Sequence, residues 1–435
     1  CNSLALAETT LDPFNPEAML PLKPALRLGG AVGDPCAEAL PAGALGLLEV
    51  INLALCSNPQ TREVWASSRA QAAQIGVSKA GYLPSASLSA SGNRNSPGVS
   101  QRSVGLTLSY LLYDFGTRAA SMESAHQLLA AANATQDSTV QTVFLLAVQS
   151  FYQTQAAQAA LNAALESERA AKESFAAAEA RYTAGSATPA DKLQAQTAYS
   201  QATLNRITVN GNMNNTKGAL ANILGLDAHR NVLLVAAEGI ASAKGSTFIN
   251  PLPLAGEGAN VLSPDGEKLN AFEQNVAALI EEARLRRPDL QAAAAQVKAA
   301  EASVDAARAS GKPTISLTAS TDQTSSAGIT SHGSSVGLSV SVPIFSGFAP
   351  TYRIRAAEAQ VEAKNAQLER LRLQVALDVW VAYQNLITAT QSLRTTADLL
   401  SSAGQSERVA LGRYKAGVGS ILDVLNAQSA LASAR

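Results

Sequence analysis

The chain has 435 residues, in which 33 Lys and Arg side chains are balanced by 34 Asp and Glu side chains. This near-neutral charge, without a basic run, argues against a nucleic-acid partner, because such a partner requires cations that neutralise phosphates. Hydrophobic residues make up 47% of the chain but aromatic residues only 5%, and Ala dominates the apolar fraction, which favours closely packed long helices over a thick globular core.

Residues 1–48 are loop-like in composition and indicate export. Cys1 is either the lipidated first residue of a mature lipoprotein or an accident of numbering, and Leu4-Ala5-Leu6-Ala7 resembles the tail of a cleaved secretory signal. Cys36 and Cys56 enclose about 20 residues, so a disulfide between them would contribute about 3 kcal/mol in the loop-entropy model. A buried free thiol is the alternative.

Two copies of one pattern follow this segment. Arg181-Tyr182-Thr183-Ala184-Gly185 reappears 232 residues later as Arg413-Tyr414-Lys415-Ala416-Gly417. Pro84 and Pro313 are 229 residues apart, which places a three-residue length difference in a predicted polar loop near 92–103. The pattern predicts an internal duplication, with an N-terminal segment 1–48, a first repeat 49–226, a linker 227–274 and a second repeat 275–435.

Each repeat opens with a helix that begins at a proline, and two amphipathic strands follow this helix. The helices are expected at 59–80 and 288–309, and the first strands at 83–94 and 314–321. In the second strands, apolar residues at every second position share one face, while Ser, Gly and Thr dominate the other. Those apolar residues are Val104, Leu106, Leu108, Tyr110 and Leu112, and Val336, Leu338, Val340, Val342 and Ile344.

A very long helix follows each strand pair. Residues 117–184 contain neither Gly nor Pro, and a helix of that length extends about 100 Å. Its counterpart is expected at 351–416. Gly185 and Gly417 are expected to end these helices in the left-handed conformation. Thr188 with Asp191 and Ser420 with Asp423 fit the capping-box pattern that starts a returning helix.

Four strands cannot close a barrel, and an open sheet edge in lipid leaves backbone groups without hydrogen bonds. Three copies would supply twelve strands, which is enough for a barrel with an open lumen. Aromatic residues gather where each strand pair meets its long helix, so they form either an interfacial belt or a packing cluster. They are Tyr110, Tyr113, Phe115, Phe345 and Phe348.

Several classes of chemistry lack their signatures. No run of 18 apolar residues is present, so a membrane-spanning helix is not expected. The scattered Cys residues and His126, His229 and His332 predict no metal cluster and no catalytic group, and phosphate-binding and nucleophile-elbow motifs are missing. The sequence therefore predicts a protein that is not an enzyme and holds no cofactor.

Short motifs at corresponding places, together with the duplicated strand pairs, resemble the TolC family of outer-membrane channels from about residue 45 onwards. They are Tyr113-Asp114-Phe115-Gly116, Pro343-Ile344-Phe345-Ser346-Gly347, the two Arg-Tyr-x-Ala-Gly tips, Ile223-Leu224-Gly225-Leu226 and Leu422-Asp423-Val424-Leu425-Asn426-Ala427-Gln428. The resemblance implies a homotrimer with a twelve-stranded β-barrel in the outer membrane of a Gram-negative cell and a long periplasmic α-helical barrel. It also implies two partners, a periplasmic adaptor (membrane fusion) protein and an inner-membrane transporter, expected to be of the ABC type.

Within that family, two segments resemble the branch that serves type I protein secretion, including toxin export. They are Asp-Pro-Cys-Ala-Glu-Ala-Leu from Asp34 and Leu53-Ala54-Leu55-Cys56-Ser57-Asn58-Pro59. The alternative within the family is a multidrug or small-molecule efflux channel. A periplasmic coiled-coil adaptor or scaffold with a lipidated Cys1 is a different class, but it would leave the apolar strand faces exposed.

The resemblance places a periplasmic gate at the two tips. Asp423 corresponds to an acid that faces the lumen, whereas the second acid of the family's double ring is Asn426 here, so one ring is expected. A capping role for Asp423 is the alternative, and for Asp191 the cap is favoured. Bonds between neighbouring hairpins are expected to hold the gate shut, with Asp191 as a candidate partner. This latch comprises Arg181, Tyr182, Arg413 and Tyr414.

The adaptor is expected to dock on the tips, because small side chains there allow close approach to the backbone. The docking residues are Ala184, Gly185, Ser186, Ala416, Gly417 and Val418. Two departures from the family stand out. Gly419 replaces an arginine, which predicts a looser constriction. The second repeat stops at Arg435, 12 residues after Asp423, so either the chain is truncated or a returning helix is missing.

Overall fold

The computed structural model describes residues 14–19, 43–95, 98–230, 232–235, 267–326 and 328–435. It divides into two compact units. One includes Arg62–Thr139 and Ala283–Ala376, and the other includes Ala25–Thr61, Val140–Glu282 and Leu377–Arg435. The four strands belong to the first unit and both tips to the second.

The same order of helices and strands occurs twice along the chain, after a short 3-10 helix at Pro16–Met19. The first set is α1 (Leu47–Ser57), α2 (Pro59–Ala80), β1 (Ser85–Asn95), β2 (Val99–Tyr113), α3 (Thr117–Thr183) and α4 (Pro189–Ile223). The second set is α5 (Glu267–Arg286), α6 (Pro288–Ala309), β3 (Thr314–Ser326), β4 (Ile329–Ser341), α7 (Ala349–Lys415) and α8 (Ile421–Ala434). The predicted bounds of α2 and α6 are confirmed, and α3 and α7 are each 67 residues long.

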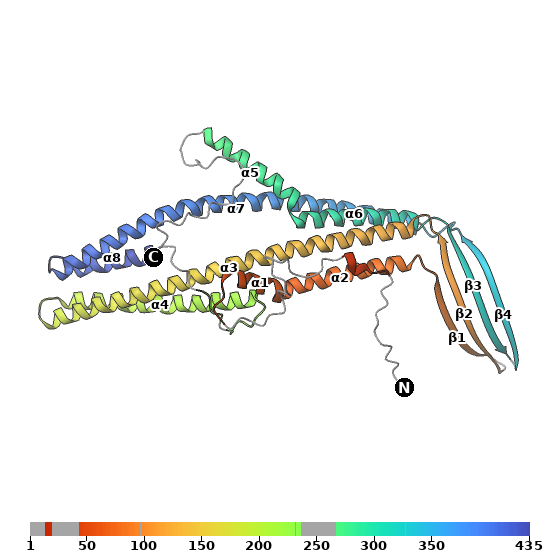
Figure 1. Cartoon of the computed structure of the whole chain (residues 1–435), viewed down its shortest axis with the longest axis horizontal. Coiled ribbons are helices and arrows are strands. Elements are labelled where there is room, and N and C mark those ends of the chain that lie inside the picture. Colours follow the sequence, from red (N-terminus) through yellow and green to blue (C-terminus); the bar gives the residue numbers. More distant parts are fainter. Residues whose placement is uncertain (1–13, 20–42, 96–97, 231, 236–266, 327) are drawn as a thin grey trace. The chain divides into compact units, whose positions relative to one another are not determined.

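The strands form one antiparallel sheet in the order β1-β2-β3-β4 (Figure 1). The prediction of a polar loop near 92–103 is wrong over most of its length, because Gly92 pairs with Arg102 inside the ladder. At the corresponding place in the second repeat, Asp322 pairs with Gly333. The Ser, Gly and Thr residues of these segments have no apolar alternation, so the sequence pattern does not identify them as strand. The ladders run to the pairs Asn95 with Val99 and Ser326 with Ile329, and Gly98 and Gly328 just before β2 and β4 have positive φ of 110° and 85°.

The predicted second strand of the second repeat extended too far towards α7. β4 ends at Ser341, so Val342 and Ile344 lie outside the ladder. Pro343 explains the end of the strand, because proline has no amide hydrogen to donate to a neighbouring strand. At the corresponding end of β2 the pairing continues to Tyr113, with a register shift between Leu111 and Tyr113.

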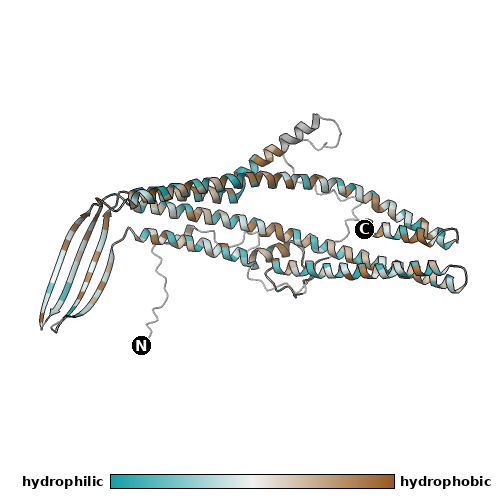
Figure 2. Ribbon diagram, turned by 180° about the vertical axis from the view of Figure 1, so that it is seen from behind, coloured by the Kyte–Doolittle hydropathy of each residue, from teal (hydrophilic) through white to brown (hydrophobic). Residues whose placement is uncertain are grey.

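The register places the apolar residues on one face of the sheet. Leu88 lies opposite Leu106, Tyr110 opposite Leu317, and Leu317 opposite Leu338. This apolar sheet face is exposed in the single chain, with Leu88 75% and Val336 78% exposed. Figure 2 shows the alternation of hydrophobic and hydrophilic residues along the strands. The opposite face, called the serine face below, carries a ladder of hydroxyl pairs: Ser91 with Ser103 at 2.8 Å, Ser316 with Ser339 at 2.7 Å and Ser320 with Ser335 at 2.8 Å.

Helix α1 is a structural feature that the sequence pattern did not predict. Its apolar side packs in a buried cluster with the middle of α3 and the end of α4. Asn58 joins α1 to α2, and its side-chain amide donates to the carbonyl oxygen of Ile223 at 3.0 Å. Nearby, a Cβ atom at Gly225 would lie 2.4 Å from the carbonyl oxygen of Ser57, so only glycine fits there. The cluster consists of Leu45, Val50, Ile51, Ala54, Leu55, Val140, Val143, Ala147, Phe151, Leu220, Ala221, Leu224 and Val232.

Candidate functional site

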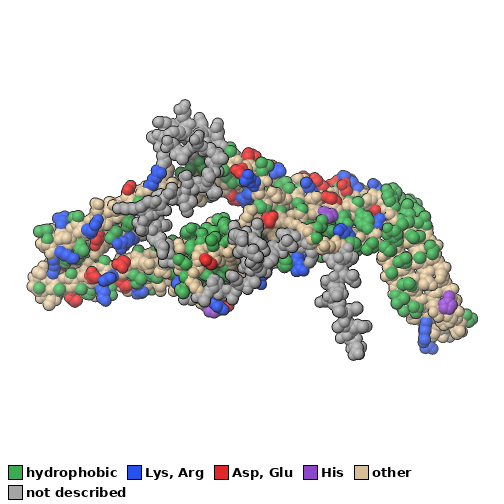
Figure 3. Space-filling view, in the orientation of Figure 1, with side chains coloured by type: hydrophobic (Ala, Val, Ile, Leu, Met, Phe, Trp, Pro, Cys, Tyr) green, Lys and Arg blue, Asp and Glu red, His purple; other side chains and the backbone are tan. Residues whose placement is uncertain are grey.

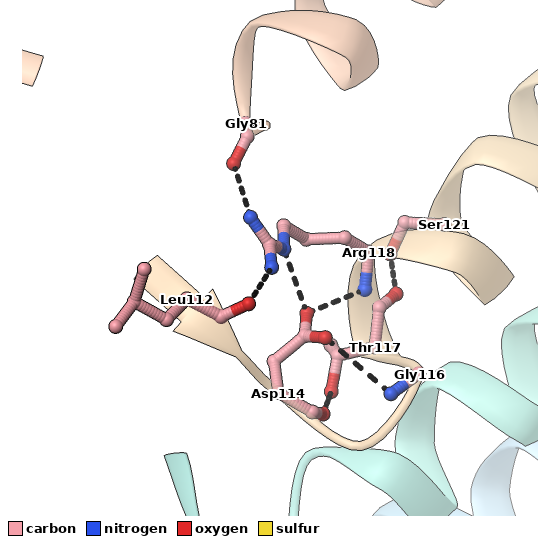
Figure 4. Close-up of polar contacts among 7 residues, drawn as sticks. All are labelled: Gly81, Leu112, Asp114, Gly116, Thr117, Arg118 and Ser121. Carbon is pink, nitrogen blue, oxygen red and sulfur yellow. Dashed lines mark hydrogen bonds and ion pairs between the residues drawn. The ribbon is translucent and has the colours of Figure 1, made fainter. Parts of the chain in front are cut away.

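A nearly buried ion pair holds the first strand-to-helix joint (Figure 4). Asp114 accepts hydrogen bonds from the amide and from Nε of Arg118, at 2.8 and 3.2 Å. The remaining guanidinium nitrogens of Arg118 donate to the carbonyl oxygens of Gly81 and Leu112, at 3.1 and 3.3 Å. The guanidinium also lies over the ring of Tyr82, 4.6 Å from its centroid. One side chain thus connects the end of α2, the end of β2 and the start of α3.

The second joint is built without this ion pair. At the 232-residue offset, Ser346 and Pro350 take the places of Asp114 and Arg118. Phe345 and Phe348 contact each other edge-to-face at a centroid distance of 5.6 Å, and they are 76% and 67% exposed. In this single chain the joint is therefore open and apolar. The interfacial belt stays a prediction.

At both tips the long helix ends as predicted. Gly185 and Gly417 have φ of 74° and 78°. Around Gly185, the amide of Gly185 donates to the carbonyl of Tyr182 and the amide of Ser186 donates to the carbonyl of Arg181, at 3.0 and 2.9 Å. This pair of bonds is the Schellman motif, which satisfies carbonyls at the end of a helix. The same two bonds recur around Gly417.

The two capping boxes are also confirmed, at the starts of α4 and α8. Asp191 accepts hydrogen bonds from the backbone amide and the hydroxyl of Thr188, at 2.9 and 2.8 Å. These bonds stabilise the charged carboxylate and lower the pKa of Asp191. At the second tip the amide of Ser420 donates to Asp423 at 3.3 Å.

One pair of the predicted latch residues lies together in the structure. Nη2 of Arg181 donates to the backbone carbonyl oxygen of Tyr414 at 2.8 Å, and the guanidinium lies 4.1 Å from the centroid of the Tyr414 ring. Tyr414 is 8% exposed and packs in a tip cluster that joins both helical hairpins of one chain. The buried members of this cluster are Ala178, Ala195, Tyr414, Ile421 and Val424.

The other predicted gate residues lie on exposed surfaces or in different contacts. The side chains of Arg413, Asp423 and Asn426 are exposed. Tyr182 is 41% exposed and contacts the ammonium of Lys192. The Asp191 carboxylate is bound by Thr188 within its own capping box. Contacts of these residues between neighbouring copies stay predictions.

The predicted docking residues form the exposed turns of the two tips. A Cβ atom at Gly185 or Gly417 would meet no other atom within 4 Å, so the demand for glycine there comes from its positive φ alone. The hydroxyl of Ser186 donates to the carbonyl oxygen of Arg181 at 3.1 Å, and Val418 is 70% exposed.

Sequence reasoning missed two features of the tips. Lys192 forms an ion pair with Glu179 at 2.9 Å, which joins α4 to α3. At Gly419, where the resemblance predicts a looser constriction through the loss of an arginine, a Cβ atom would lie 2.9 Å from the backbone nitrogen of Tyr414. The turn therefore has no room for a side chain at this position. Neither feature leaves a signal in a single sequence, because both depend on contacts made after the chain reverses.

The predicted cysteine sites lie mostly outside the described residues. This applies to Cys1 and Cys36. Cys56 is disulfide-bonded, and its pairing with Cys36 stays a prediction. In the described part of the chain, no group of three or more His, Cys, Asp or Glu side chains is placed to hold a metal ion. Across the same residues, no helix has the length and apolar character needed to cross a membrane.

Comparisons with known proteins agree with this architecture. Residues 50–226 and 279–435 match the family described as outer membrane efflux protein. Protein CyaE of Bordetella pertussis is 32% identical over 403 residues, which cover 90% of this chain and 79% of that protein. The solvent efflux pump outer membrane protein SrpC of Pseudomonas putida is 34% identical, over 35% of this chain and 33% of its own. The crystal structure of CusC shares the fold, with a TM-score of 0.72, 22% identity and coverage of 96% of this chain and 92% of that one.

Proposed function

The chain belongs to the outer membrane efflux protein family, and from this premise we propose that three copies assemble into a duct that exports protein by type I secretion. It is an outer-membrane channel for efflux or secretion rather than an enzyme. The resemblance of the Leu53-to-Pro59 segment to the type I secretion branch supports protein, rather than small molecules, as the cargo. This segment forms the junction of α1 and α2, where Leu55 and Asn58 are buried.

The sheet supports the proposed trimer. β1 and β4 each have a neighbour on one side only, so both outer edges have backbone groups available for pairing. Pairing β4 of one copy with β1 of the next closes a ring of twelve strands and leaves no edge. The apolar sheet face then meets lipid, and the serine face lines a water-filled lumen.

We infer that the tips contact the other parts of the export system. Each long helix begins beside the strands and ends 67 residues later, and 67 residues of helix extend about 100 Å. An adaptor that reaches up from the inner membrane would meet the exposed turns around Gly185 and Gly417. The adaptor would recruit an inner-membrane transporter of the ABC type, which supplies the energy.

The gate is proposed to lie at the same tips. The bond from Arg181 to Tyr414 joins the two hairpins of one chain, so opening the tip by separating them would break it. Asp423 and Asn426 are exposed and one helical turn apart, which allows both to face a central lumen when three chains assemble.

The partial match to SrpC favours small-molecule efflux as the second candidate, and one experiment separates the two. The gene for this channel is deleted in its own cell, and the proteins in the medium and the sensitivity to solvents and dyes are measured. Type I secretion predicts that specific proteins disappear from the medium and accumulate inside the cell, while sensitivity is unchanged. Unchanged secreted proteins with raised sensitivity would reject protein export. Electrophoresis of unheated and heated samples tests the trimer.

A further inference from the structure

The charges of the four strands are distributed unequally between the two faces of the sheet. Arg94 and Arg102 are the only Lys or Arg residues in the strands, and Asp322 is the only acid. The register places both arginines on the apolar sheet face and Asp322 on the serine face, opposite Gly105 and Gly333. The backbone of the sheet therefore separates the arginines from the one carboxylate of the strands.

Arg94 and Arg102 lie next to each other near the hairpin end of the sheet, away from the helices. Arg94 pairs with Ser100 and Arg102 with Gly92, which makes the two arginines diagonal neighbours whose Cα atoms are about 7 to 8 Å apart. Both side chains are exposed, and neither has an ion-pair partner among the described residues. In Figure 3, Lys or Arg and His side chains appear at this end of the sheet, and hydrophobic side chains gather nearer the helices.

Strand geometry gives the height of Arg102 above the apolar band along the membrane normal. From Tyr113 to Val104 the strand extends about 30 Å, which a tilt of about 40° reduces to roughly 23 Å. This matches the outward apolar band of outer-membrane barrels, about 25 Å tall. Arg102 lies two residues beyond Val104, about 7 Å along the strand, which the same tilt reduces to roughly 5 Å. That distance is similar to the thickness of one headgroup layer, roughly 5 to 7 Å.

We propose that Arg94 and Arg102 form a binding site for the phosphate groups of a phosphorylated glycolipid in the outer leaflet of the membrane. The site continues the lipid-facing surface, and its charge is complementary to phosphate. Guanidinium groups bind phosphate oxygens through two parallel hydrogen bonds, which suits a lipid held beside a barrel wall. This inference rests on the outer-membrane location and on the apolar sheet face meeting lipid, and it is independent of the cargo.

The full-length chain, purified in detergent, is incubated with a diphosphorylated outer-leaflet glycolipid or with its dephosphorylated form. Native mass spectrometry measures the copies retained. We expect the wild type to retain the phosphorylated lipid at least tenfold better than the dephosphorylated one. The double variant Arg94→Gln/Arg102→Gln should lose this preference. The control Arg370→Gln/Arg394→Gln removes two exposed cations from α7 and should keep it.

A second variant guards against a folding defect. Arg94→Lys/Arg102→Lys keeps both charges but not the bidentate geometry, so it should retain part of the preference. Equal retention of both lipids by the wild type, or an unchanged preference in the double Gln variant, would overturn the site. Displacement of the lipid by millimolar inorganic phosphate alone would overturn the lipid assignment. Unchanged protein export after deletion of the gene, with intact lipid retention by the purified wild type, would count only against the proposed function.

Discussion

The bond between Arg181 and Tyr414 gives the most specific prediction for the tips. Its hydrogen bond comes from a charged donor, and such bonds contribute about 1.5 to 3 kcal/mol. The cation–π contact adds about 0.5 to 2 kcal/mol. Because Arg181 is only partly buried and both contacts vanish together, we expect Arg181→Ala to cost about 2 kcal/mol per chain. That cost is roughly a 30-fold change in the equilibrium between joined and separated hairpins.

The structure also predicts which substitutions leave the bond intact. Tyr414→Phe keeps both the ring and the carbonyl oxygen that Arg181 contacts, and Arg413 is exposed. In planar bilayers, Arg181→Ala should therefore raise the single-channel conductance or the open time, while Tyr414→Phe should not. An effect of Arg413→Ser would come from its predicted bond to a neighbouring copy rather than from this bond. Hydrogen exchange at the end of α7 should rise only in Arg181→Ala. An equal effect of Tyr414→Phe would refute the reasoning, because it would assign the bond to the phenol hydroxyl.

Four further predictions concern the joint and the tips. The side chains of Arg118 and Asp114 are 15% and 10% exposed, so Arg118→Ala leaves a nearly buried carboxylate without its charge partner. This variant should lower the free energy of unfolding by about 3 kcal/mol in heat unfolding. An unchanged unfolding midpoint would contradict the role of the ion pair. The pKa of Asp191 is lowered in the native state, so its contribution to stability is complete above its ordinary pKa of 3.8 and is lost as pH falls through the native pKa. In denaturant unfolding, the difference in stability between wild type and Asp191→Asn should be present at pH 7 and disappear in strong acid. Gly419→Ala brings a Cβ atom to 2.9 Å from a backbone nitrogen of α7 and should cost about 1 to 3 kcal/mol, whereas unaltered stability would show that the turn yields. Asp423→Ala should weaken block of the channel by divalent cations, and identical block would leave only a capping role.

Features that depend on neighbouring residues in the chain could be predicted. The bounds of α2 and α6 follow from a proline at the start and a 3.6-residue period. The Schellman glycines and capping boxes use hydrogen bonds that span three to five residues, so a short segment contains the whole interaction. The apolar sheet face was predicted for the same reason, since alternation along one strand fixes which side chains share a face.

Features that depend on distant parts of the chain could not be predicted. Helix α1 is stabilised by contacts with α3 and α4, and a short apolar segment by itself does not specify a helix. The strands extend further towards their turns than the sequence pattern predicts, because Ser, Gly and Thr pair in a ladder without an apolar alternation. Arg118 lies in the first turn of α3, and nothing in that local sequence indicates that the carbonyls of Gly81 and Leu112 lie beside its guanidinium.

The sequence by itself determined the elements, their repetition and the residues at which the chain reverses, because these follow from backbone preferences and short-range hydrogen bonds. The tertiary structure decided which atoms of those residues interact. Only the packing of the two hairpins shows that Arg181 contacts the carbonyl and the ring of Tyr414, and only the strand register shows that Arg94 and Arg102 share the apolar face. Pairing across a sheet or between helices is set by packing of residues far apart in the chain, and that information is spread over the whole sequence rather than held in any one segment.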